Sequence, residues 1–225
     1  MCSVRVPFYT SNDLRGVIAP EEAVESVRDA YTELAGSGLA EPRTKLTPEG
    51  GVFTGYFAHL PRTGYSGAYA YTGGFRSRDA WFLLALYDAK TGEPAALVDG
   101  ASLNPLKTGA VGAVGTDALT RRDAEALALF GAGLQARRAV RATATVRDLS
   151  EVSVYTPSDS KEGFAEKADG EYSFEVRPAE TPPDALEDAD VVHTATTSSE
   201  PVFDGHDLPD GRRRGDAVRL GWHGG

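Results

Sequence analysis

The chain has 225 residues, 41% of them apolar, and its 33 Asp and Glu against 23 Lys and Arg give a formal charge of −10. This composition predicts a folded protein of one large or two smaller domains, and its charge disfavours nucleic acid and anionic membranes as partners. No apolar run approaches the length of a bilayer span and the N-terminus lacks the apolar core of a secretory signal, so we expect a cytoplasmic protein.

Cysteine and lysine are both scarce. Cys2 is the single cysteine, which excludes an internal disulfide and a cysteine-based zinc site. The four histidines lack the spacing of metal ligands, so we expect no metal site. An acidic chain that strongly prefers Arg to Lys is typical of proteins from salt-loving, halophilic microbes, in which salt screens the repulsion between charges.

Residues 11–36 are predicted to be helical. Two start signals, Ser11-Asn12-Asp13 and Pro20-Glu21-Glu22, precede a set of apolar residues at helical spacing. The sequence Gly36-Ser-Gly38 then predicts the end of the helix.

The next predicted elements are a sheet and a second helix. Between Arg43 and Asp99, short apolar runs alternate with turn-forming residues, which predicts an antiparallel sheet. The segment Leu103–Leu119 is rich in Gly and Ala, so we expect a helix that can pack tightly against another backbone. These elements predict an α+β domain at residues 1–120.

A glycine turn follows the apolar run that ends at Phe130. In Gly131-Ala-Gly-Leu-Gln-Ala136, Gly131 permits a sharp turn, Gly133 lets the backbone approach a phosphate, and Ala136 allows close packing of a helix on a strand. The helix start would add free N–H groups and the positive end of its dipole. The pattern predicts a site for a dinucleotide pyrophosphate.

The segment after the turn fits one βαβ unit, with a helix at 135–148 and a strand at Glu151–Tyr155. About 20 residues past the glycines, an NAD enzyme usually has an Asp or Glu that binds the ribose hydroxyls. Thr156 stands there instead, with Ser158 close by. The missing carboxylate removes repulsion against a 2′-phosphate and favours NADP over NAD; alternatively, Thr-Pro-Ser is only a turn.

A further strand is predicted at Val191-Val192, and it continues into Thr194-Ala-Thr196. Small hydroxyl residues after a strand lie at the carboxyl edge of a sheet, where dinucleotides bind. We therefore expect a Rossmann-like parallel sheet at 121–225 and an α/β protein overall. His193, inside this strand, is expected to be a packed or hydrogen-bonded residue rather than an acid–base catalyst.

Several motifs in this order resemble the ornithine cyclodeaminase/mu-crystallin family. They are Asp88-Ala-Lys-Thr-Gly-Glu-Pro94, Val98-Asp-Gly100, Leu106-Lys-Thr-Gly-Ala110, the glycine turn, and Ala189-Asp-Val-Val-His-Thr-Ala-Thr196 followed by Glu200-Pro201. The resemblance implies a homodimer formed through the first domain and a second domain that binds NADP or NAD. It also implies that a C=N bond of a small amino or imino acid is formed or reduced by hydride exchange with the nicotinamide.

The resemblance assigns roles to individual residues. Arg43 looks like the arginine that grips the substrate carboxylate, and Lys107 stands where the family usually has an Arg that contacts carboxylate or phosphate. Lysine keeps the charge but lacks the fork geometry of arginine. The residues that match positions lining the cofactor are Thr108, Leu134, Gln135, Thr194, Ala195 and Thr196.

Two departures from the family pattern concern catalysis. Tyr69 stands where the family has its catalytic lysine; it is a candidate proton or hydrogen-bond donor, or alternatively an aromatic residue that fills an alternating strand. After Gly211 the family's next strand, with its essential Asp, has no counterpart. We expect a Rossmann-like domain truncated after about 211, either by a frameshift or as a natural short paralogue.

These departures leave more than one function open. The first interpretation is an NAD(P)-dependent oxidoreductase or cyclodeaminase acting on a small amino or imino acid. The second is a catalytically impaired homologue that binds nucleotide, or dimerises, without turnover. An activity like that of alanine dehydrogenase lies within the same fold and is not distinguished by the sequence.

Overall fold

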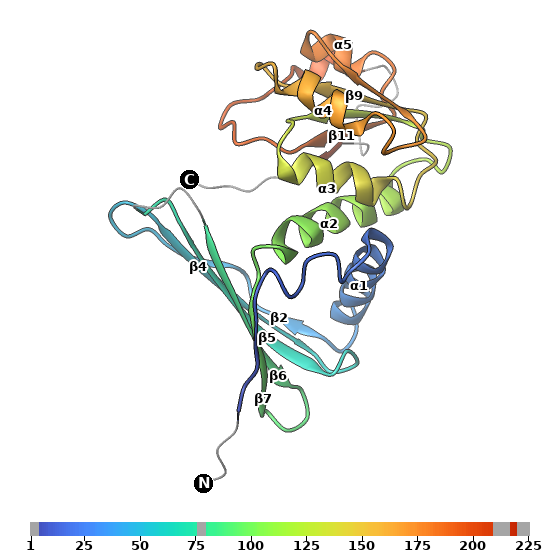
Figure 1. Ribbon diagram of the computed structural model, residues 1–225. Coiled ribbons are helices and arrows are strands. Elements are labelled where there is room, and N and C mark those ends of the chain that lie inside the picture. Colours follow the sequence, from blue (N-terminus) through green and yellow to red (C-terminus); the bar gives the residue numbers. More distant parts are fainter. Residues whose placement is uncertain (1–4, 76–79, 209–216, 220–225) are drawn as a thin grey trace. The chain divides into compact units, whose positions relative to one another are not determined.

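The computed structural model describes residues 5–75, 80–208 and 217–219 (Figure 1). The described chain divides into two compact units, the first ending at Asn104 and the second beginning at Pro105. The sequence-based boundary at residue 120 assigns one more helix to the first domain, and it stays a prediction. Cys2 and most of the segment after Gly211 lie outside the described residues.

A seven-stranded sheet forms the first unit, in the order β1-β7-β6-β5-β4-β2, with β3 also paired to β4. Its strands are β1 (Phe8–Tyr9), β2 (Leu39–Ala40), β3 (Thr44–Leu46), β4 (Val52–Leu60), β5 (Tyr65–Gly73), β6 (Trp81–Asp88) and β7 (Pro94–Asp99). Neighbours from β4 to β7 are antiparallel, which confirms the predicted sheet. The short β1 adds a parallel edge strand beside β7.

The helix of the first unit is shorter than predicted. It is α1 (Pro20–Leu34), whereas residues 11–18 form turns, so the predicted start at Ser11 is wrong. The residue before a proline avoids helical backbone, and Gly16 has a φ of +74°, which a right-handed helix does not accommodate. Ser11 instead ties this segment to the sheet, because its N–H donates to the Asp99 carboxylate at 3.3 Å.

The second unit contains a parallel sheet in the order β10-β9-β8-β11-β12. Its strands are β8 (Ala126–Phe130), β9 (Glu151–Tyr155), β10 (Glu175–Pro178), β11 (Val191–Thr194) and β12 (Ala217–Arg219). Counted from β8, the spatial order is 3-2-1-4-5, as in doubly wound folds, and the winding reverses between β8 and β11. The predicted Rossmann-like sheet is confirmed, and β9 matches its predicted strand residue for residue.

The helices are α2 (Leu103–Leu119), α3 (Leu134–Thr143), α4 (Ser160–Ala168) and α5 (Pro182–Leu186), with a short 3-10 helix at Gly205–Asp207. The helix predicted at Leu103–Leu119 is confirmed in both of its bounds. The helix predicted at 135–148 ends early, at Thr143. The β-branched residues that follow weaken a helix, and Arg147 binds carbonyl groups at the end of α2 instead.

One close backbone contact and two apolar clusters hold the layers of the second unit together. A Cβ on Gly109 would lie 2.5 Å from the carbonyl oxygen of Arg138, so α2 and α3 touch through their backbones, as the small residues of α2 predict. One apolar cluster packs α3 and α4 on a face of the sheet, around Val140 and Phe164. A second cluster on the opposite face packs α5 against the sheet, around Leu186 and Phe130.

None of the helices in the described part of the chain has both the length and the apolarity needed to cross a membrane. Within the same residues, no three His, Cys, Asp or Glu side chains gather closely enough to hold a metal ion.

Candidate functional site

The turn between β8 and α3 is enclosed by the ends of two neighbouring strands. The N–H of Gly131 donates to the carbonyl of Tyr155 at the end of β9 at 2.8 Å, and the N–H of Ala195 donates to the carbonyl of Phe130 at 2.8 Å. Gly131 has a φ of +112°, and a Cβ there would lie 2.3 Å from the carbonyl oxygen of Ala195. No residue with a side chain fits this position without a shift of the backbone.

Gly133, two residues later, has very different surroundings. It is the N-cap of α3 with an extended backbone, and no atom of the described residues lies within 4 Å of a Cβ built on it. Leu134, the first residue of α3, is exposed as well. The start of α3 therefore faces open space, where its free N–H groups and the positive end of the helix dipole can meet an anion.

Two buried oxygens at the same edge of the sheet have no hydrogen-bond partner among the described residues. They are Oε1 of Gln135, in the first turn of α3, and Oγ1 of Thr194, at the end of β11. Buried polar atoms in folded proteins are nearly always paired with protein, water or a ligand, so these two atoms can accept a hydrogen bond from a bound group. The structure brings both residues to the carboxyl edge of β8 and β11, together with Gly133 and Ala195.

The segment after β9 carries hydroxyl groups at the place where an NAD enzyme usually has an Asp or Glu for the ribose. Thr156 is half-buried, and the Ser158 hydroxyl lies 2.8 Å from that of Ser160. The ammonium of Lys161 lies 3.6 Å from a Glu162 oxygen and 3.9 Å from a Glu180 oxygen. This corner of the edge thus holds hydroxyl donors and a lysine whose charge two carboxylates share.

His193 is a buried, hydrogen-bonded residue, as predicted. Its Nε2 lies 2.9 Å from the Thr116 hydroxyl, so it ties α2 to β11, and its Nδ1 has no partner among the described residues. Complete burial lowers the pKa of His193 from 6.5 to about 4, because the charged ring would lose its hydration. A neutral ring without access to solvent is unsuited to acid–base catalysis.

The remaining predicted site residues lie on other elements. Lys107 is exposed and Thr108 half-buried in the first half of α2, and both belong to the second unit. Thr196 follows β11, and its hydroxyl accepts a hydrogen bond from the N–H of Ser198 at 3.1 Å. The ligand roles of these residues stay predictions.

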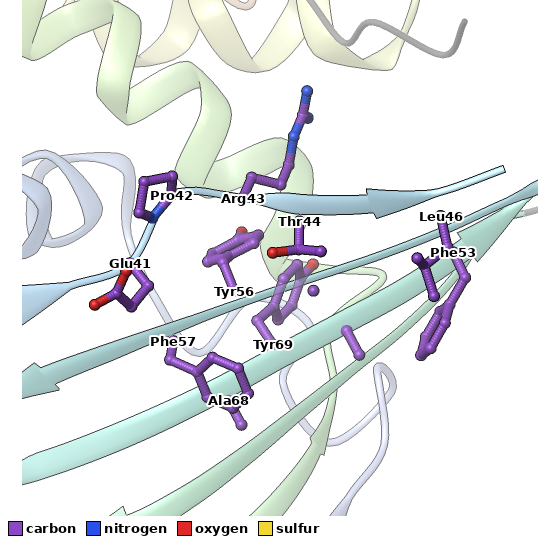
Figure 2. A pocket seen from close by; sticks show the side chains of 12 residues that line it. Glu41, Pro42, Arg43, Thr44, Leu46, Phe53, Tyr56, Phe57, Ala68 and Tyr69 are labelled. Atoms are coloured by element: carbon purple, nitrogen blue, oxygen red, sulfur yellow. The ribbon is translucent and has the colours of Figure 1, made fainter.

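In the first unit, Arg43 lies in the segment between β2 and β3. Its Nη1 donates to the Tyr71 hydroxyl at 3.1 Å, a contact between residues 28 apart in the sequence. Figure 2 shows Arg43 on the same side of the strands as the rings of Tyr56 and Tyr69, whereas Phe57 projects from the opposite side. This arrangement follows from the strand alternation of β4 and β5.

Tyr69 lies at the centre of an aromatic cluster. Its ring centroid is 5.3 Å from that of Tyr56, 6.0 Å from that of Tyr71 and 6.1 Å from that of Phe82. A Cβ on Gly100 would lie 2.9 Å from Cε2 of Tyr69, so this glycine makes room for the ring. The motif Val98-Asp-Gly100 thereby acquires a structural reason that its sequence did not reveal.

The phenol of Tyr69 stays protonated over the physiological pH range. Burial raises its pKa above the ordinary value of 10, and the nearby Tyr56, Tyr71 and Asp99 add to the shift because each disfavours a second negative charge. At neutral pH this group can donate a hydrogen bond, but it cannot act as a base or supply a positive charge.

The opposite side of the same sheet is apolar and open. Phe53, Phe57, Trp81 and Leu83 are all exposed, and the strand register places them on one face. A groove of about 520 Å³ runs along this face beside Phe57 and Tyr87. A second groove, of about 630 Å³, is lined by Arg43, Tyr56 and Tyr69 as well as by Phe53 and Phe57 (Figure 2). A contiguous exposed apolar surface of this kind marks an interaction site.

A parallel sheet of order 3-2-1-4-5, with a glycine turn and an open helix start at the point where the winding reverses, defines a protein of the Rossmann type. The sequence profile of the ornithine cyclodeaminase/mu-crystallin family matches residues 71–212. The chain belongs to this family, which confirms the resemblance carried by its motifs.

Curated relatives are longer than this chain. A putative dehydrogenase of Rhizobium meliloti is 32% identical over 212 residues, which make up 88% of this chain and 64% of the relative. A Delta(1)-pyrroline-2-carboxylate reductase of Bacillus cereus is 34% identical over 122 residues, which make up 54% of this chain and 38% of the relative. The chain therefore spans less than two thirds of the length of either protein.

Solved structures share the fold. Delta(1)-pyrroline-2-carboxylate reductase from Thermococcus litoralis, in complex with NADH and L-proline, aligns with a TM-score of 0.84 and 27% identity over 95% of this chain and 69% of that chain. A probable ornithine cyclodeaminase from Bordetella pertussis Tohama I aligns with a TM-score of 0.83 and 27% identity over 91% of this chain and 65% of that chain.

Proposed function

We propose that the chain binds NAD(P)H and a small amino or imino acid and exchanges a hydride across a C–N bond, as an oxidoreductase or a cyclodeaminase. One observation carries the proposal: Gly133 faces open space at the start of α3, while Gly131 in the same turn is enclosed by backbone. No steric contact within the fold requires a glycine at position 133, whereas a ligand that approaches the backbone there would require one. The unpaired oxygens of Gln135 and Thr194 at the same edge fit such a ligand.

The residues of the chain would divide the remaining tasks. A bound nicotinamide would supply the hydride chemistry, which no side chain can supply. Arg43 would bind the substrate carboxylate through two parallel hydrogen bonds, and Lys107 would contribute a further positive charge toward an anion. Tyr69, held in its protonated form, would donate a hydrogen bond or a proton to the substrate.

We further propose that NADPH is preferred over NADH. No carboxylate follows β9 at Thr156, and the hydroxyls of Ser158 and Ser160 with the ammonium of Lys161 lie at the start of α4. These groups can bind a 2′-phosphate, while an Asp at position 156 would repel it. Thr156→Asp should therefore reverse the order of the two dissociation constants. A tighter NADH complex in the unmodified chain would contradict the preference.

We also propose that two copies of the chain form a homodimer through the apolar face of the first unit. Support comes from the exposed Phe53, Phe57, Trp81 and Leu83 and from the groove of about 520 Å³ beside Phe57. Burial of these side chains against a second copy would remove apolar surface from water at about 25 cal/mol per Å². Light scattering of Phe57→Glu should give the monomer mass at concentrations where the unmodified chain is dimeric.

A second candidate function is nucleotide binding without turnover, and Tyr69 is the observation that favours it. A neutral phenol does not offer the ammonium that the family site usually provides at this position. The two functions differ in one measurement, which is the consumption of NADPH with Delta(1)-pyrroline-2-carboxylate, or with pyruvate plus ammonia. Tight NADPH binding without consumption would favour the second candidate.

The glycine turn offers a direct test of dinucleotide binding. Gly133→Val should lower the melting temperature only slightly, because its side chain enters open space but valine is a poorer N-cap than glycine. It should weaken NADPH binding at least tenfold, because the side chain occupies the phosphate position. Fluorescence titration with NADPH measures the dissociation constant, and calorimetry measures the melting temperature.

Gly131→Ala is the matched control for this test. Its methyl group meets the Ala195 carbonyl, so the variant should lose stability as well as binding. If Gly133→Val binds NADPH as tightly as the unmodified chain does, or if the unmodified chain binds neither NADPH nor NADH, the proposed function is wrong.

A further inference from the structure

The contact between Arg43 and Tyr71 has a consequence for substrate binding. Arg43 is exposed and lies outside the regular strands, so its long side chain would ordinarily sample many rotamers. Restricting such a side chain costs up to about 2 kcal/mol of conformational entropy. Its guanidinium instead donates to the Tyr71 hydroxyl at 3.1 Å, which fixes one end of the side chain before any ligand arrives.

Tyr71 is itself held firmly. It is 6% exposed and lies near the end of β5, where it pairs in register with Thr54 on one side and Phe82 on the other. Its ring centroid lies 5.4 Å from that of Phe82 and 6.0 Å from that of Tyr69. The hydroxyl that accepts the hydrogen bond from Arg43 is therefore anchored by the core of the first unit.

The bond to Tyr71 uses one N–H of the guanidinium fork and is made by Nη1. The edge formed by Nε and Nη2 can still meet a carboxylate with two parallel hydrogen bonds. We propose that Tyr71 is a positioning residue, which holds Arg43 in the orientation that binds the substrate carboxylate. This inference rests on the proposed function, because that function assigns the carboxylate to Arg43.

Tyr71→Phe removes the hydroxyl and keeps the ring, so it tests the contact with little change in packing. The KM for Delta(1)-pyrroline-2-carboxylate should rise about three- to tenfold, which is the range expected for the net contribution of one ordinary hydrogen bond. The kcat and the dissociation constant of NADPH should change less than twofold. Tyr65→Phe, an exposed position on the same strand, is the matched control and should change neither constant.

A second measurement does not depend on turnover. The heteronuclear NOE of the Arg43 Nε–H group, measured by ¹⁵N NMR on the full chain without ligand, reports how far the side chain is ordered. It should be high in the unmodified chain and in Tyr65→Phe, and should fall clearly in Tyr71→Phe. An NOE that is unchanged by the loss of the hydroxyl overturns the proposal.

Arg43→Gln separates this proposal from the proposed function. If Arg43→Gln leaves the KM unchanged, the assignment of the carboxylate to Arg43 fails. If Arg43→Gln raises the KM and Tyr71→Phe does not, the positioning role fails while the function stands. In the double variant, Tyr71→Phe should add nothing to the effect of Arg43→Gln, because the two residues act as one unit; an additive effect would indicate a purely structural role for Tyr71.

Discussion

Neighbouring residues of one motif can be glycine for unrelated reasons. Gly131 is required by the fold, since its φ is positive and the Ala195 carbonyl occupies the space of a Cβ. Gly133 has an ordinary φ of −82° and open space around it. The fold constrains the first position and a ligand would constrain the second, so substitutions at the two sites separate stability from binding.

At the same scale, His193 predicts a dependence of stability on pH. The folded pKa of about 4 lies below the unfolded value of 6.5, so the unfolded chain binds a proton more readily between these values. The contribution of the neutral His193 ring to the free energy of unfolding is fully present above pH 6.5 and is lost as the pH falls toward 4. At pH 5 the loss is about 2 kcal/mol relative to pH 7.

Urea unfolding at pH 7 and pH 5 measures this loss. In His193→Gln, the glutamine can keep a hydrogen bond to Thr116, but its side chain does not titrate. Between pH 7 and pH 5, the free energy of unfolding of this variant should therefore fall by about 2 kcal/mol less than that of the unmodified chain. An equal fall in both proteins would show that other groups dominate the acid sensitivity.

At the scale of elements, a single buried arginine closes the end of α2. Arg147 is 6% exposed, and it donates to the carbonyls of Thr116, Asp117 and Thr120 and to the Asp117 carboxylate. The last carbonyls of a helix have no partner within the helix. Arg147 donates to them from the loop that follows α3, and it thereby joins two elements.

Arg147→Met keeps the length of the side chain and removes its donors. It should lower the free energy of unfolding by about 3 kcal/mol, because the carbonyls of Asp117 and Thr120 and the Asp117 carboxylate each lose a charged donor. Arg122→Met, at an exposed position nearby, should change it by less than about 0.5 kcal/mol. Similar values for the two variants in urea unfolding would contradict the role of Arg147.

Local patterns predict the elements whose signals lie within a few residues of each other. Such patterns predict the helix α2, the strand β9 and the glycine turn, because small-residue content, β-branched residues and glycine spacing are local properties. No such pattern predicts the elements of the segment 160–186, because α4 carries Gly163, β10 is short and ends in Pro178, and α5 has five residues.

Local patterns also predict only part of the candidate site. The positions of Gly131 and Gly133 follow from the motif itself. The contact of Arg43 with Tyr71 and that of Thr116 with His193 join residues 28 and 77 apart in sequence, and no local pattern contains them. A weak signal existed for the first contact, since Tyr69 and Tyr71 must share one face of a strand.

At the scale of the whole molecule, the formal charge of −10 predicts a stabilising effect of salt. Repulsion among excess carboxylates disfavours the compact state, and added salt screens it over a length of about 10 Å at 0.1 M and about 3 Å at 1 M. The melting temperature should rise by about 3 °C or more between 0.05 M and 1 M NaCl, as 1 kcal/mol corresponds to about 2–4 °C at this size.

The form of this rise separates screening from other salt effects. The rise in melting temperature caused by screening should level off once the screening length falls below the spacing of surface charges. The rise caused by stronger apolar burial would continue as the salt concentration increases. Calorimetry over several NaCl concentrations should therefore give a curve that flattens. A melting temperature that is insensitive to NaCl would show that the carboxylates are already balanced within the fold.

The apolar face of the first unit also carries its own optical reporter. Trp81 is 70% exposed on that face, and the sequence holds one other tryptophan, Trp222. An indole in water emits at longer wavelengths than one enclosed by apolar side chains. After Trp222→Phe, the colour of the emitted light alone would show, in dilute solution and without any label, whether this face meets water or another surface.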